Sequence, residues 1–254
     1  MGGGHNRIGM IGGALAALTL LAGGPALAAD VQVAVAANFT EPAKEIAAAF
    51  EAKTHDHVLL SFGASGQFYA QITHGAPYEV FLSADADRPA QAEKDGFAVP
   101  GARFTYAVGK LALFSKTPGL VDGGGRVLKS DKFQKLAIAD PAVAPYGVAA
   151  VQTLTELGVY DQLKPKLVMG TSIAQTYQFV QTGAAELGFV ALSQIIAETG
   201  GSRWIVPESD HAPIEQQAVL LKTGKDNPAA KAFLAFLKGP EARKVILRFG
   251  YGTK

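Results

Sequence analysis

Short apolar runs that are typical of buried strands alternate with segments of helical spacing along most of this chain. The first run, Val31–Ala36, is followed by Glu41–Phe50, where apolar residues recur on one helical face. The order of strand and helix then repeats through Val58–Phe62, Ser65–Thr73, Val80–Ser83 and Ala86–Lys94. This alternation predicts a parallel sheet with helices on both faces and right-handed crossovers.

The alternation stops near Phe104 and begins again at Leu136. In between, two strand-like runs, Phe104–Val108 and Leu111–Phe114, precede a stretch rich in glycine. The second series of strands and helices comprises Leu136–Ala139, Tyr146–Leu157, Lys166–Val168, Ile173–Gln181 and Leu187–Val190. A returning strand and two closing helices are expected at Ala218–Leu221, Ala229–Leu237 and Glu241–Phe249.

Two series of this kind predict an α/β protein with two doubly wound domains joined by a two-strand hinge. Each half has about 100 residues, which is enough for a small core of its own. We expect the first lobe to be discontinuous, with residues 29–109 and 217–254, and the second lobe to span residues 110–216. A ligand cleft is expected between the lobes.

The N-terminus has the layout of a secretory signal. Arg7 precedes the apolar stretch Ile8–Leu21, a Gly-Gly-Pro break follows, and Ala26 and Ala28 are the small residues of a cleavage site. The apolar stretch is short for a membrane-spanning helix. We therefore expect residues 1–28 to be a cleaved signal peptide and the rest to be exported to the periplasm.

Charge and cysteine content exclude several classes of protein. Arg7 is the only charged side chain before residue 29, and the 23 basic side chains less Arg7 leave 22 against 22 acidic ones. This balance argues against a nucleic-acid partner and against a polybasic membrane surface. The chain has no cysteine, so disulfides, cysteine nucleophiles and a lipidated N-terminal cysteine are ruled out.

Four predicted strand-to-helix turns carry polar and small residues, and they span residues 36–41, 62–67, 139–147 and 170–173. In open α/β sheets, ligands bind beyond the carboxyl ends of the strands, and helix starts favour anions. Asn38 with Glu41, and Ser172 with Gln175, have the spacing of helix caps. None of the turns contains Lys or Arg, so an anion bound there would be held by neutral dipoles.

The donors in these turns suit a fully deprotonated tetrahedral oxyanion. Phosphate at neutral pH carries a proton and benefits from an acceptor. The only carboxylates in the turns, Glu41 and Asp140, fit cap and turn roles, which makes a phosphate site less favoured. Which dianion fits, sulfate or a larger one, depends on cavity size, and residue types do not decide that.

Serine hydrolysis and cation binding are two alternatives to anion binding. Gly63–Gly66 resembles part of a serine hydrolase elbow, but Gln67 stands where G-x-S-x-G requires glycine, and the histidine would have to be His74 or His211. A cation site could use His55 and His57, or Asp85 and Asp87, because residues two apart on a strand share a face. Zinc needs three or four converging ligands, so solvated positions explain these residues better.

The segments VAVAANF, SFGASG, GAPYEVFLSAD, ADPAVAPYG, ELGFVALS and FLKGPEARKVILRFGY resemble the molybdate-binding periplasmic proteins of ABC importers. The resemblance runs from about Val31 to Lys254. It implies a hinged type II periplasmic binding fold that holds molybdate or tungstate between its domains. It also implies delivery to an inner-membrane permease by a monomer that has no cofactor and no catalytic activity.

By position, the resemblance implies that Asn38, through its side-chain amide, and Ser65 bind the oxyanion from the first domain. The second domain would contribute the backbone N–H groups of Tyr146 and Ile173. These four residues would hold molybdenum as the bound oxyanion and not as direct metal ligands. Ala191 stands where some relatives bind through a tyrosine, which leaves open whether the Tyr146 hydroxyl takes part.

Overall fold

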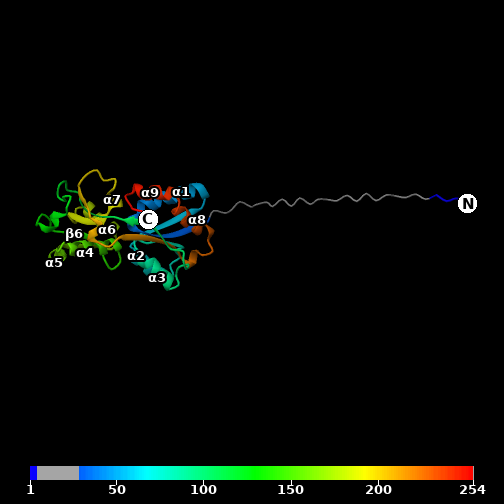
Figure 1. Ribbon diagram of the computed structural model, residues 1–254, viewed down its shortest axis with the longest axis horizontal. Helices are drawn as coiled ribbons and strands as arrows, with labels where there is room; N and C mark the ends of the chain where they lie inside the picture. Colours follow the sequence, from blue (N-terminus) through cyan, green and yellow to red (C-terminus); the bar gives the residue numbers. More distant parts are fainter. Residues whose placement is uncertain (5–28, 254) are drawn as a thin grey trace.

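The computed structural model describes residues 1–4 and 29–253, so residues 5–28 of the predicted signal peptide lie outside the described residues. Two five-stranded sheets, each covered by helices, form two lobes that lie side by side (Figure 1). Among the described residues, no helix has both the length and the apolar character to cross a membrane.

The first lobe contains a sheet of strand order β2-β1-β3-β10-β4. β1 pairs in parallel with β2 and β3, whereas β10 runs antiparallel to β3 and β4. The strands are β1 (Asp30–Ala36), β2 (His57–Gly63), β3 (Val80–Leu82), β4 (Phe104–Gly109) and β10 (Ile214–Leu220). The helices are α1 (Thr40–Thr54), α2 (Ser65–Thr73), α3 (Asp87–Lys94), α8 (Pro228–Leu237) and α9 (Pro240–Arg248).

Alternation along β1 builds a core on each face of this sheet. Val33 and Val35 pack with Phe50 of α1 and other residues of α1, α8 and α9. Ala34 points to the opposite face, where Phe68 of α2 lies. The helices seen above and below this sheet in Figure 1 therefore cover two separate apolar surfaces.

The second lobe contains a sheet of strand order β7-β6-β8-β5-β9, in which β5 is antiparallel to both of its neighbours. Its strands are β5 (Leu111–Ser115), β6 (Leu136–Ala139), β7 (Leu167–Gly170), β8 (Leu187–Ala191) and β9 (Ser202–Ile205). Its helices are α4 (Pro145–Glu156), α5 (Tyr160–Leu163), α6 (Ile173–Gln181) and α7 (Leu192–Ile195). Short 3-10 turns occur in both lobes. The first lobe has η1 (Ala37–Phe39) and η5 (Lys222–Gly224), and the second has η2 (Arg126–Lys129), η3 (Lys164–Lys166) and η4 (Glu208–Asp210).

The predicted fold of two α/β domains is confirmed, but the second domain boundary is wrong. The predicted boundary after residue 216 falls inside β10, which pairs with β4 from Ile214 onward. The chain therefore crosses between lobes at Lys110 and again before Ile214. Three polar residues, Glu215–Gln217, interrupt the apolar run in this strand, and so the sequence pattern starts the strand too late.

Candidate functional site

A small cavity lies where the two lobes meet. Its volume is ≈ 10 Å³, far below the ≈ 390 Å³ of a larger cleft beside it. No charged side chain lines it; the lining residues are Ala36, Ala37, Asn38, Gly63, Ala64, Ser65, Ala84, Ala144, Pro145 and Ile173. Sites for organic ligands usually measure about 300–1,000 Å³, so the size favours a small ion.

The cavity is built from the carboxyl ends of parallel strands in both lobes. β1, β2 and β3 contribute from the first lobe, and the helices α4 and α6 that follow β6 and β7 contribute from the second. Two larger clefts flank the cavity, because one shares Ala84 and Pro145 with it and the other shares Ala37 and Asn38. The cavity thus occupies the middle of the interface between the lobes.

Helix α2 starts at the cavity with one unused backbone donor. The Ala64 N–H donates to Gln67 Oε1 at 3.3 Å, and the Gly66 N–H donates across the interface to the Val143 carbonyl at 2.9 Å. No hydrogen bond in the described part of the chain uses the Ser65 N–H. This N–H belongs to the first turn of a helix, where the backbone dipoles favour an anion.

The start of α4 in the second lobe has the same property. Pro145 has no N–H, and the Gly147 N–H donates to the Ala144 carbonyl at 2.9 Å. The Tyr146 N–H is left without an acceptor among the described residues.

Helix α6 repeats this pattern. Ser172 caps it as predicted, since its Oγ accepts the Gln175 N–H at 3.3 Å. The Ile173 N–H takes part in no hydrogen bond within the described residues. Three helix starts from two lobes therefore lie at one cavity, and each has an unused donor in its first turn.

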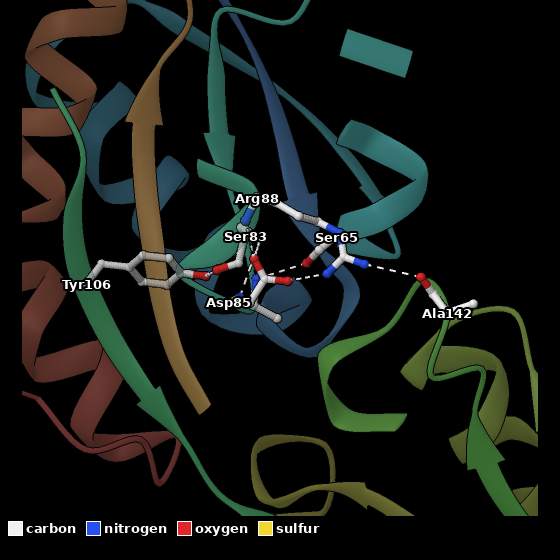
Figure 2. A network of polar contacts seen from close by, with 7 residues as sticks. Ser65, Ser83, Asp85, Arg88, Tyr106 and Ala142 are labelled. Atoms are coloured by element: carbon white, nitrogen blue, oxygen red, sulfur yellow. Dashed lines mark hydrogen bonds and ion pairs between the residues drawn. The ribbon is translucent and has the colours of Figure 1, made fainter. Parts of the chain in front are cut away.

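The Ser65 hydroxyl is held in place by the turn that follows β3. Ser65 is 1% exposed, and its Oγ accepts the Ala84 N–H at 2.9 Å. Figure 2 shows the hydroxyl beside this turn. Because Oγ is the acceptor in that contact, its own hydrogen can donate toward a bound anion.

Asn38 lies at the cavity but does not cap α1, so the predicted cap is wrong. A 3-10 turn intervenes after β1, and α1 begins at Thr40 with no side-chain cap. The buried Asn38 amide donates to Gln216 Oε1 at 2.8 Å and to the Tyr251 hydroxyl at 3.0 Å. Both amide hydrogens are used by these bonds, and this leaves the Asn38 backbone N–H as its available donor.

Tyr146 does not line the cavity, although its neighbour Pro145 does. Its hydroxyl accepts from Gln216 Nε2 at 3.2 Å, within the interface between the lobes. Burial, and next the neighbouring Tyr251 and Tyr106, raise the pKa of Tyr146 well above its usual range. The phenol therefore stays neutral and is engaged with first-lobe residues.

Arg88 is an interface residue that the sequence did not reveal. Its guanidinium pairs with Asp85 and donates to the Ala142 carbonyl of the other lobe at 3.3 Å (Figure 2). The pair is close to neutral overall and does not line the cavity. Its partner in the second lobe is a backbone carbonyl, and nothing in a sequence marks such a contact.

The two alternative functions gain no support. Among the described residues, no histidine ring hydrogen-bonds to Ser65, and the Nδ1 atoms of His74 and His211 face the carbonyls of Ala70 and Ala212. No group of three His, Cys, Asp or Glu residues in the described ranges could hold a metal ion. The geometry at this cavity is that of an anion site without charged ligands.

Comparisons with known proteins agree with this geometry. The family of bacterial extracellular solute-binding proteins matches residues 31–252. The chain is 59% identical over 230 residues to the molybdate-binding protein ModA of Rhodobacter capsulatus, which covers 91% of each chain. It is 58% identical over 232 residues to ModA of Azotobacter vinelandii, covering 90% of this chain and 92% of the relative.

A solved structure shares the arrangement of the two lobes. The periplasmic molybdate-binding protein of Azotobacter vinelandii superposes with a TM-score of 0.86 at 43% identity. The match covers 88% of this chain and 99% of that one.

Proposed function

The chain belongs to the family of bacterial extracellular solute-binding proteins, and we propose that it binds molybdate between its lobes for uptake by an ABC importer. One observation carries the proposal: three helix starts with unused N–H groups, two of them in the second lobe, lie at a cavity lined by no charged side chain. When a dianion held by neutral donors is released, no positively charged side chain is left without its partner.

We assign four residues to the anion. Ser65 would donate through its hydroxyl and its backbone N–H, and Asn38, Tyr146 and Ile173 through their backbone N–H groups. The backbone donors at these positions have no other acceptor, which supports the assignment. The side chains of Asn38 and Tyr146 are already hydrogen-bonded to other residues, so their backbone N–H groups are the donors that remain. Hydrogen bonds to a charged group contribute about 1.5–3 kcal/mol each, so the five donors of these four residues account for firm binding.

The donor set also bears on which anion binds. Phosphate at neutral pH would present an O–H group to a cavity that has no carboxylate in its lining. Sulfate and tungstate have the same charge and shape as molybdate. We propose that tungstate also binds and that sulfate, which is smaller, leaves some of the donors out of reach.

The N-terminal sequence pattern bears on the cellular role. The N-terminal pattern supports export and cleavage after Ala28, which would place the protein in the periplasm. We propose that it acts there as a monomer and without catalysis. The two lobes would close on the anion, and the closed form would deliver it to the inner-membrane permease.

Calorimetric titration of the protein with molybdate, tungstate, sulfate and phosphate tests the proposal. We expect saturable binding of molybdate and tungstate, and weak or absent binding of phosphate. Absence of molybdate binding, with sulfate bound instead, would assign the protein to another oxyanion. Ester hydrolysis that disappears in Ser65→Ala would favour the hydrolase.

A further inference from the structure

A buried polar network lies behind the cavity and joins the lobes. Its members are all at most 8% exposed, and they are Asn38, Tyr106, Tyr146, Ser193, Gln216 and Tyr251. Four of them belong to the first lobe, whereas Tyr146 and Ser193 come from α4 and α7 of the second. Polar side chains buried at an interface must find partners there, so this network fixes how the lobes fit together.

The Gln216 side chain donates a hydrogen bond to the second lobe. Its Oε1 accepts from Asn38 Nδ2 at 2.8 Å and from the Tyr106 hydroxyl at 3.0 Å. These two bonds orient the amide, and its Nε2 then donates to the Tyr146 hydroxyl at 3.2 Å. The first lobe thus holds a preset partner for the tip of the Tyr146 side chain.

Gly109 provides the space for that tip. A Cβ atom at this position would lie 2.2 Å from the Tyr146 hydroxyl oxygen and 2.7 Å from Gln216 Nε2. Gly109 ends β4, immediately before the chain crosses to the second lobe. Its φ is not in the left-handed region, so glycine is required here by the close contacts, first with the phenol and then with the Gln216 amide.

The phenol and the proposed anion donor belong to the same residue. Tyr146 lies in the first turn of α4, so seating its ring on the first lobe also fixes the position of its backbone N–H. We infer that the Tyr146 side chain is a positioning group: Gly109 and Gln216 form a seat for its hydroxyl, and the seated ring places the start of α4 against the anion. This inference rests on the proposed function.

Four variants test the inference with molybdate as the probe: Tyr146→Phe, Gly109→Ala, the double variant, and Tyr78→Phe as control. The Tyr78 hydroxyl donates to Gln71 Oε1 at 3.0 Å within the first lobe and has no bond to the network. Tyr146→Phe keeps every proposed anion donor, yet we expect roughly fivefold weaker binding through faster dissociation.

Gly109→Ala should weaken binding more, since the added methyl keeps the phenol from its seat. The double variant removes the hydroxyl that the methyl would strike, and we expect it to bind more tightly than Gly109→Ala alone. Tyr78→Phe should leave the molybdate dissociation rate within about twofold of wild type, because its hydroxyl bonds only to Gln71 outside the network. The inference would be overturned if molybdate dissociates from Tyr146→Phe at the wild-type rate. It would also be overturned if the double variant binds molybdate no more tightly than Gly109→Ala.

A readout without anion separates this inference from the proposed function. The unfolding free energies of wild type, both single variants and the double variant form a double-mutant cycle. We expect positions 109 and 146 to be coupled, with Tyr146→Phe restoring part of the stability lost in Gly109→Ala. Additive values overturn the seat whatever the titrations show, whereas coupling without molybdate binding overturns only the proposed ligand. If Gly109→Ala does not fold, the dissociation rate of Tyr146→Phe decides.

Discussion

The two lobes present different chemistry to the cavity between them. Besides the backbone N–H groups of Asn38 and Ser65, the first lobe offers a side-chain hydroxyl, that of Ser65, which the Ala84 N–H holds in place. The second lobe contributes the starts of α4 and α6, where Tyr146 and Ile173 offer backbone N–H groups. Donors of the first kind depend on which residue is present, while donors of the second kind depend on where a helix begins.

This difference predicts which substitutions matter. In the second lobe, side chains at the cavity can vary as long as the backbone keeps its position against the first lobe. Contacts across the interface should therefore affect binding more than the identity of the second-lobe residues does. The variants below test this comparison.

Gly66→Ala should have the largest effect. A Cβ atom at Gly66 would lie 2.9 Å from Val143 Cα and 3.0 Å from the Val143 carbonyl oxygen, both backbone atoms of the other lobe. The lobes would have to separate, and binding would lose the two second-lobe donors. At about 1.5–3 kcal/mol for each bond, we expect molybdate binding to weaken at least a hundredfold in calorimetric titration.

Stability measurements sharpen this prediction. Alanine is favoured over glycine in helices by about 1 kcal/mol, so Gly66→Ala should not destabilise α2 itself. Gly123→Ala is the matched control, because no atom lies within 4 Å of its added Cβ. Unchanged affinity in Gly66→Ala would show that the interface does not control binding.

Ser65→Ala should weaken molybdate binding about tenfold to a hundredfold, because it removes one hydroxyl donor to a charged ligand. It also leaves the Ala84 N–H without its acceptor, so a loss of about 1–3 kcal/mol in unfolding free energy is expected. Ser83→Ala is the control, since this buried hydroxyl donates to Asp85 at 3.1 Å instead. Equal affinities of the two variants would remove Ser65 from the site.

Ile173→Val should change affinity less than twofold, because the backbone N–H is the proposed donor and valine retains it. The side chain is 4% exposed, so its shortening should lower the unfolding free energy by about 0.5–1.5 kcal/mol. Titration and urea unfolding of the same preparation would check both values. A tenfold loss of affinity with little loss of stability would show that the side chain itself shapes the site.

Local signals in the sequence predicted the helix starts well. α2 and α6 begin at Ser65 and Ile173 as expected, because an amphipathic segment follows a short polar turn in each case. The four-residue elements α5, α7 and β9 were missed, since segments this short show no clear periodicity. The placement of site residues at helix starts was therefore accessible from the sequence.

Contacts between distant parts of the chain were not accessible. The spacing of Asn38 suggested a local cap, yet its amide bonds to Gln216, 178 positions away. The Arg88 guanidinium reaches the Ala142 carbonyl across 54 positions, and any residue at position 142 would offer the same backbone acceptor. The network that joins the lobes depends on tertiary packing, and a single sequence does not encode it in any local pattern.

Changes in pH should have the smallest effect on affinity. No Asp, Glu, His, Lys or Arg lines the cavity, and burial raises the pKa values of Tyr106 and Tyr146 well above the usual range. We expect molybdate affinity to vary less than about twofold between roughly pH 6 and pH 9, where unperturbed tyrosine with a pKa of about 10 is still neutral. A tenfold change per pH unit would reveal a titrating ligand group.

Stability should respond to alkaline pH even though affinity does not. A phenol whose pKa is higher in the folded state stabilises the protein fully below its unfolded pKa of about 10, and this contribution is lost as the pH rises further. Burial raises the pKa of Tyr251 as well, so three tyrosines should act together. Urea unfolding above roughly pH 10 should show a falling free energy, with a shallower fall in Tyr106→Phe because one ionising group is gone. An equal slope in both proteins would mean that the Tyr106 phenol ionises as readily in the folded as in the unfolded chain.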